Sequence, residues 1–278
     1  MRAAAGLARR LASSAAAGAP TPCSSCCPRH PIVLCHGLMD VGRYLHIPYF
    51  LKVGEALTEM GCEVFEPKIP TFAGIERRAA ALLLYIRELF ATKRLKPDAK
   101  LNLVAHSLGG LDARWLITHL EGHRCVASLT TIATPHRGTT LADWGMETIG
   151  EWMKLEALFQ LVGVETNSFR DLKTSSLVKF NQTTPDHPDV KYFSYGASKP
   201  VDQMPYLLRL PHSYIEGREG RNDGLVSVTS ANWGEYLGTI AADHYEQVNW
   251  VLPGSMSTFK AIPFYRDGVA GVLAERGL

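Results

Sequence analysis

The chain of 278 residues predicts an α/β fold with a mostly parallel sheet and helices on both faces. Short apolar runs rich in β-branched residues alternate with longer segments of helical periodicity. The short runs are almost continuously apolar, which is typical of strands buried on both faces. One of them ends at a serine just before a helical pattern, at the edge where open α/β sheets bind their ligands.

The expected elements alternate along the chain. Apolar runs predict strands at residues 31–37, 62–67, 100–106, 126–134 and 190–198. Helical spacing predicts helices at residues 47–61, 75–90 and 111–120, and Gly61 suits a left-handed cap at the end of the first. This order is typical of parallel β-α-β units.

The first thirty residues differ in composition from the rest. They are rich in alanine, serine and arginine, and the first acidic residue of the chain is Asp40. Such a start is typical of a mitochondrial presequence, and Arg9 and Arg10 interrupt the only stretch that could serve as a secretory signal. We expect residues 1–30 to be a presequence and linker and residues 31–278 to be one domain. A disordered tail on a cytoplasmic protein is the alternative.

Composition argues against several classes of protein. No uncharged apolar run approaches the ~18 residues of a membrane-spanning helix, and a net charge of +2 gives no footprint for nucleic acid. Cys23, Cys26 and Cys27 lie close together, but no second ligand pair at zinc-finger spacing follows them. We expect no transmembrane segment, no nucleic-acid partner and no bound metal.

Residues 139–165 interrupt the alternation with an amphipathic segment. Apolar side chains, among them Trp144 and Trp152, lie close to one helical face, while acidic residues lie on the other. An ordinary surface helix is the more common explanation of such a stripe. Its place after a strand end suggests a helical lid that swings over a site and contacts a lipid surface.

The stretch "LNLVAHSLGGLDARW" places Ser107 in a strand–turn–helix context. The nucleophile elbow G-x-S-x-G requires small residues two before and two after the serine, because its turn is sharp. Ala105 and Gly109 occupy these positions here. The following helix directs its N-terminal N–H groups toward the serine, which favours an oxyanion there.

A nucleophilic serine needs a histidine that takes its proton and a carboxylate that orients the histidine. The α/β-hydrolase order is serine, acid, histidine. Asp223 lies in an Asn-Asp-Gly turn ahead of a β-like run, and His244 is the only histidine after it. Asp202, which follows the run at 190–198, is the alternative acid.

An oxyanion hole needs two N–H donors. One is expected from Leu108, the residue after the serine. The other is expected from Leu38 in "LCHGLMD", where Gly37 lets the backbone approach closely.

These stretches together resemble the triacylglycerol lipases of the α/β-hydrolase superfamily, both the bacterial true lipases and the fungal mitochondrial family. The matching stretches run from "PIVLCHGL" through "IATPHRGTTLAD" and "NDGLVSV" to "DHYEQVN". The resemblance implies Ser107 as nucleophile, Asp223 as acid, His244 as base, and the segment after "TPHRG" as lid.

The resemblance also implies a question about calcium. Bacterial members hold a structural calcium partly through side chains shortly after the catalytic histidine, and those places correspond here to Glu246 and Trp250. An indole offers no oxygen ligand, which argues against calcium in this chain.

The sequence therefore predicts a serine carboxylester hydrolase that acts on acylglycerols without an organic cofactor. Transfer of the acyl group, or cleavage of a thioester or phospholipid, uses the same machinery and stays open. A lipid-binding scaffold without catalysis is the alternative from another class. Complete retention of nucleophile, acid, base and donors argues against it.

Overall fold

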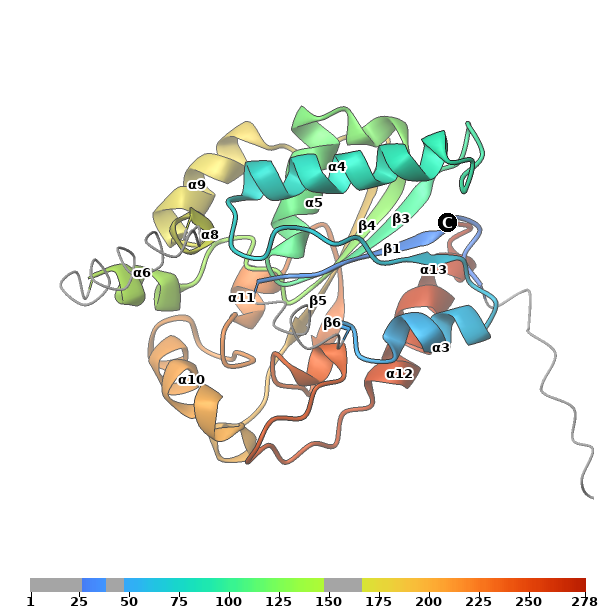
Figure 1. Ribbon diagram of the computed structural model, residues 1–278. Helices are drawn as coiled ribbons and strands as arrows, with labels where there is room; N and C mark the ends of the chain where they lie inside the picture. The colour runs from blue at the N-terminus through green and yellow to red at the C-terminus, as the bar shows by residue number, and fades with distance from the viewer. Residues whose placement is uncertain (1–26, 39–47, 148–166) are drawn as a thin grey trace, which may run out of the picture.

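A six-stranded parallel sheet forms the centre of the computed structural model, which describes residues 27–38, 48–147 and 167–278 (Figure 1). The strands lie in the order β2-β1-β3-β4-β5-β6, and each neighbouring pair is parallel. Their bounds are β1 Ile32–Cys35, β2 Val64–Phe65, β3 Leu101–His106, β4 Val126–Ile132, β5 Lys191–Ala197 and β6 Glu235–Ile240.

Helices cover both faces of the sheet, as the apolar strands predict (Figure 1). The helices with standard α geometry are α3 Val53–Glu59, α4 Ile75–Ala91, α5 Gly109–His119, α6 Thr140–Glu147, α8 Asn167–Asp171, α9 Thr174–Thr183, α10 Tyr206–Glu219, α11 Val228–Ala231, α12 Ala261–Pro263 and α13 Val272–Glu275. A π-helical stretch, Phe264–Gly271, joins α12 to α13.

The alternation of side chains along β1 separates two cores. Val33 and Cys35 pack with α4 and α5 on one face. Ile32 and Leu34 pack on the other face with α3 and the C-terminal helices, including Leu273 of α13. All four β1 side chains are buried, so this strand has no solvent-facing side, which explains its uninterrupted apolar sequence.

The first predicted helix is shorter than expected. Lys52 has φ 59°, so the regular helix begins only at Val53. Its end agrees with the sequence: Gly61 has φ 100°, and its N–H donates to the Thr58 carbonyl over 2.9 Å. The N–H of Cys62 donates to the Leu57 carbonyl over 3.0 Å, which completes a Schellman cap.

The run after Asp223 is not a strand, so this expectation was wrong. Asn222 and Ser227 form one isolated antiparallel bridge, and helix α11 follows at once. The Ser227 hydroxyl accepts from the Ser230 N–H over 3.1 Å, and this cap starts the helix. The last strand, β6, lies further along the chain.

The expected presequence and the expected lid within the domain are described only in part. Residues 1–26 of the expected presequence and residues 148–165 of the expected lid lie outside the described residues, while α6 covers the start of the lid. Within the described ranges, no helix combines the length and apolar character needed to cross a membrane.

Candidate active site

Ser107 occupies a sharp turn directly after β3. Its φ is 56°, in the left-handed region that non-glycine residues rarely adopt. The Ser107 N–H donates to the Ile132 carbonyl over 3.0 Å, and the Ser107 carbonyl accepts from the Thr134 hydroxyl over 2.7 Å. These bonds hold a strained backbone in place, as in a nucleophile elbow.

The small residues around this turn are required by close backbone contacts. A Cβ on Gly109 would lie 2.5 Å from the Cys35 carbonyl oxygen, so a larger residue would push α5 away from the end of β1. A Cβ on Gly37 would lie 2.7 Å from the Ser107 Cβ. Ala105 is fully buried between β1 and β4, where a methyl group fits.

The two predicted oxyanion donors come from different loops: Leu38 follows β1, and Leu108 follows Ser107 directly. Leu38 follows Gly37 and lines the same cavity as Ser107. Leu108 lies between Ser107 and the first residue of α5, where a backbone N–H has no intrahelical acceptor and the helix dipole is positive. The role of these two N–H groups as oxyanion donors stays a prediction.

Asp223 and His244 are in direct contact. His244 Nδ1 lies 2.7 Å from Asp223 Oδ2, and the His244 backbone N–H donates to the Asp223 carbonyl over 2.9 Å. Asp223 is fully buried, and its Oδ1 accepts from the N–H groups of Leu225 and Val226 over 3.0 and 2.8 Å. These bonds fix the direction of the carboxyl group.

Gln247 is a site residue that sequence reasoning missed. Its side-chain amide donates to Asp223 Oδ2 over 2.7 Å, beside the bond to His244. Gln247 and His244 therefore share the same carboxylate oxygen of Asp223 as hydrogen-bond partner. The only signal in the sequence is its place three residues after His244, which does not indicate a partner.

His106 packs against His244 with ring centroids 4.5 Å apart. Its Nδ1 is hydrogen-bonded to the Tyr49 hydroxyl over 2.8 Å. Burial, reinforced by the charge of His244, lowers the pKa of His106 well below its ordinary value. A neutral ring at this place does not repel a protonated His244.

A buried ion pair connects the elbow to the loop after β1, and sequence reasoning missed it too. Arg78 of α4 donates through Nε to Asp112 of α5 over 2.8 Å, and both side chains are fully buried. The same guanidinium donates to the carbonyls of His36 and Gly37 over 2.8 and 3.3 Å. A charged residue within the apolar stripe of a helix was the available signal.

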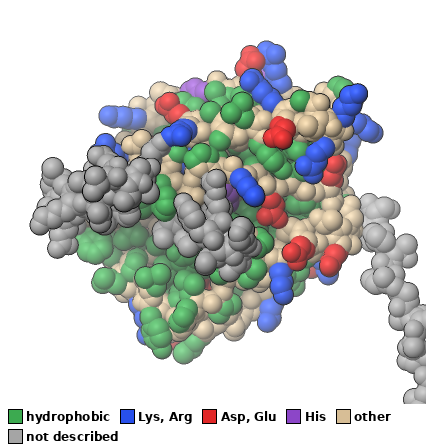
Figure 2. Space-filling view, in the orientation of Figure 1, with side chains coloured by type: hydrophobic (Ala, Val, Ile, Leu, Met, Phe, Trp, Pro, Cys, Tyr) green, Lys and Arg blue, Asp and Glu red, His purple; other side chains and the backbone are tan. Residues whose placement is uncertain are grey.

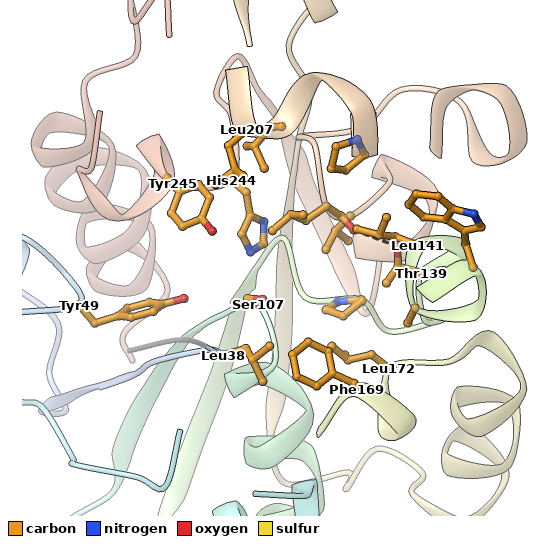
Figure 3. A pocket seen from close by; sticks show the side chains of 17 residues that line it. Leu38, Tyr49, Ser107, Thr139, Leu141, Phe169, Leu172, Leu207, His244 and Tyr245 are labelled. Carbon is orange, nitrogen blue, oxygen red and sulfur yellow. Dashed lines mark hydrogen bonds between the residues drawn. The ribbon is translucent and has the colours of Figure 1, made fainter. Parts of the chain in front are cut away.

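Ser107 and His244 line one apolar cavity of about 430 Å³ (Figure 3). Leu38 lies below Ser107 in this view, His244 lies above it, and Phe169 and Leu172 lie to one side. The contacts of the described residues do not include a hydrogen bond from Ser107 to His244. Such bonds are often long in free enzymes and shorten when substrate binds.

The alternative acid and two histidines near strand ends have other surroundings. Asp202, the alternative acid, is exposed. His36 Nε2 accepts from the Ile69 N–H over 3.2 Å, and His136 is bonded to Thr131 over 3.0 Å; both therefore serve as loop hydrogen-bonding groups.

The site does not fit the calcium that the family resemblance implies. The Lys199 ammonium lies 2.7 Å from Glu246 Oε1, and a cation already occupies that side of the carboxylate. Trp250 donates its indole N–H to the Tyr49 carbonyl over 2.9 Å. In the part of the chain that is described, no cluster of three or more His, Cys, Asp or Glu side chains is placed to hold a metal ion.

Comparisons with known proteins identify relatives along most of the chain. A family model described as "Putative serine esterase (DUF676)" matches residues 28–195. Triacylglycerol lipase 2 of Saccharomyces cerevisiae is 32% identical over 270 residues, covering 80% of this chain and 81% of the yeast protein. A triacylglycerol lipase of Vibrio cholerae is 28% identical over 289 residues, covering 90% and 89%.

Solved structures show the same fold. Staphylococcus hyicus lipase superposes with a TM-score of 0.71 at 19% identity, covering 90% of this chain and 97% of that one. A Bacillus licheniformis lipase in its mature form has a TM-score of 0.66 at 22% identity, covering 90% and 95%. The fold is therefore the α/β-hydrolase fold, and the chain belongs to the serine esterase family DUF676.

Proposed function

We propose that this protein is a triacylglycerol lipase in which Ser107, His244 and Asp223 form the catalytic triad. The observation that carries the proposal is the cavity shared by Ser107 and His244, with His244 held by the buried Asp223 carboxylate. The yeast and Vibrio relatives, which are named triacylglycerol lipases, support the choice of substrate.

In the proposed reaction the Ser107 oxygen attacks the ester carbonyl while His244 Nε2 takes the hydroxyl proton. Asp223 orients the imidazole and stabilises its protonated form. The N–H groups of Leu38 and Leu108 bind the tetrahedral oxyanion. His244 then protonates the departing alcohol, water attacks the acyl-enzyme by the same steps, and the fatty acid leaves; the reaction needs no organic cofactor.

The apolar lining of the cavity favours an acyl chain as the bound group. The same steps would serve an acyltransferase, a thioesterase or a phospholipase. A side-by-side assay of triacylglycerol, phospholipid, acyl-CoA and short-chain ester separates these activities, and we expect turnover of triacylglycerol. Turnover of acyl-CoA alone would replace the lipase assignment with a thioesterase.

Labelling by a fluorophosphonate probe tests the nucleophile. The probe should label the wild-type protein, and Ser107→Ala should abolish the labelling because no other serine is expected to have an activated hydroxyl. Ser230→Ala is a matched control, since Ser230 is buried but donates to the Gly138 carbonyl. Equal labelling of wild type and Ser107→Ala would exclude Ser107 as the nucleophile.

We further propose that the rim of the cavity contacts a lipid surface. The lining residues Trp144 of α6 and Leu207 of α10 are 37% and 68% exposed, and Leu210 of α10 is 69% exposed. Hydrophobic side chains gather at the lower left of the molecule, where Figure 1 places α10 (Figure 2). An apolar surface beside an apolar cavity fits an oil–water interface.

The variant Leu210→Ser tests this contact, with Leu84→Ser as control because Leu84 is equally apolar and 65% exposed, but on α4. Leu210→Ser should lower hydrolysis of emulsified triacylglycerol and leave hydrolysis of a dissolved short-chain ester unchanged. Equal loss on both substrates would indicate a defect in the site rather than at the interface.

We propose mitochondrial targeting by residues 1–20, on the basis of their arginines and the lack of acidic residues. Import into isolated mitochondria should require this segment. Import that is unaffected by its deletion would refute the role of this segment as a presequence.

A further inference from the structure

A buried lysine lies beside the loop that carries His244. Lys199 follows β5 and is only 4% exposed. Its Nζ lies 2.7 Å from Glu246 Oε1, 3.4 Å from Asp243 Oδ2 and 2.9 Å from the Ser255 hydroxyl. The two carboxylates that receive this cation flank His244 in the sequence.

Asp243 and Glu246 also form a reciprocal cap around His244. Asp243 Oδ1 accepts from the N–H groups of Tyr245 and Glu246 over 3.0 and 3.1 Å. Glu246 Oε2 accepts from the Asp243 N–H over 3.0 Å. This is the capping-box arrangement, which fixes the backbone on both sides of His244.

Each carboxylate therefore uses one oxygen for the cap and presents the other to Lys199. Two buried carboxylates this close would repel each other without a cation between them. Burial and the neighbouring Glu246 raise the pKa of Asp243. Burial acts to raise the pKa of Glu246 as well, but hydrogen bonds from Lys199, the Asp243 amide, Ser257 and Ser255 lower it below its ordinary value.

The backbone of Lys199 reaches the other half of the site. Its N–H donates to the Asn222 carbonyl over 3.2 Å, directly before Asp223. One residue thus contacts both the loop of Asp223 and the loop of His244.

We propose that the Lys199 ammonium is a built-in cation that holds the His244 loop, so that folding and ester hydrolysis are independent of calcium. A calcium ion needs six to eight oxygen ligands at about 2.3–2.6 Å, and the ammonium occupies the place between the carboxylates that such an ion would need. Lys199 is a positioning residue that acts through Asp243 and Glu246. The part of this proposal that concerns activity rests on the proposed role of His244, whereas the part that concerns folding does not.

The experiment compares wild type, Lys199→Ala and Lys199→Met, each with EDTA and with added CaCl2. Tm is measured by thermal unfolding, and kcat and KM are measured with a dissolved short-chain ester. Wild type should give the same values under both conditions. Lys199→Met keeps most of the side chain's volume and removes its charge, so it should lower Tm and reduce kcat by about 10-fold or more, with KM little changed.

Lys199→Ala opens space beside the free carboxylates, so CaCl2 should restore part of its Tm and kcat. Lys199→Ala combined with Glu246→Gln removes one carboxylate and should lose this rescue. Lys191→Met is the matched control, because Lys191 is an exposed lysine at the other end of β5. It should behave as wild type.

Loss of wild-type Tm or activity in EDTA would overturn the proposal. So would a Lys199→Met variant with wild-type Tm and kcat, or a folded Lys199→Ala variant on which calcium has no effect. If wild type hydrolyses no ester and is not labelled by fluorophosphonate, the proposed function fails, and the Tm values still decide the role of Lys199.

Discussion

At the scale of single residues, the site depends on groups whose polar atoms have fixed partners. Asp223 accepts two backbone N–H groups on one oxygen and two side chains, His244 and Gln247, on the other. Each oxygen of this carboxylate therefore has two hydrogen-bond partners, which fix its orientation. In the proposed mechanism, the reactivity of Ser107 depends on this fixed geometry as well as on the serine itself.

Replacing the acid tests this dependence. Asp223→Asn should lower kcat by about 10⁴-fold, because the amide favours the wrong tautomer of His244. Tm should fall only modestly, since the shape is kept. Asp202→Asn is the control, because Asp202 is exposed and should leave kcat unchanged. A large loss in Asp202→Asn with little loss in Asp223→Asn would reverse the assignment of the acid.

The sequence indicated the pair Asp223 and His244 through chain order, and the structure places them in contact. It did not indicate Lys199, Gln247 or Arg78. The sequence position of a charged or amide side chain does not reveal its partner. The carboxylates that Lys199 contacts, Asp243 and Glu246, lie 44 and 47 residues further along the chain. Only the packed fold brings such groups together.

At the scale of elements, the strands that carry uninterrupted apolar runs were predictable. β6 was not, because it is half exposed and contains Gly238, which weakens any strand pattern. The run after Asp223 looked β-like because it is rich in valine and serine. A local hydrogen bond from the Ser230 N–H to the Ser227 hydroxyl determined a helix there instead.

Arg78 connects three elements, and its removal should show how strongly they depend on each other. Arg78→Met leaves Asp112 buried without its cation, so we expect a loss of about 3–5 kcal/mol in the free energy of unfolding. The His36 and Gly37 carbonyls each lose one donor as well. Because Leu38, a proposed oxyanion donor, follows Gly37 directly, kcat should fall.

The control for this variant is Arg87→Met, an exposed arginine on the same helix. Combining Arg78→Met with Asp112→Leu should recover much of the stability, because no buried charge remains unpaired. Recovery of stability without recovery of kcat would separate the role of Arg78 at the loop from its role in the core. If Arg78→Met unfolds no more easily than Arg87→Met, the ion pair does not stabilise the fold.

At the scale of the whole molecule, buried histidines determine the response to acid. Burial lowers the pKa of His106 and of His136 well below the ordinary value, with the charge of His244 and of Arg114, respectively, adding to the effect. The unfolded chain binds two protons below about pH 6.5 that the folded chain does not bind, so stability falls as the pH decreases.

Asp112 acts in the opposite direction. Burial raises its pKa to about 7, so the folded chain keeps a proton that the unfolded chain releases down to about pH 4. Between about pH 6.5 and 5.5 the two histidines outweigh Asp112, so these three groups together lower the free energy of unfolding as the pH decreases. Urea unfolding across this range measures it, and Asp112→Asn should steepen the loss. Stability that rises on acidification to about pH 5.5 would contradict the balance.

The core on one face of β1 is completed by α13, one of the last elements of the chain. Leu273 and Ala270 belong to the same core as Ile32 and Leu34, although nearly the whole chain separates them. His244, too, lies far along the chain from Ser107. While the chain is synthesised from its N-terminus, the proposed nucleophile and the proposed base are not yet in contact. Esterase activity should therefore arise only at the end of folding, once the last elements have packed onto β1.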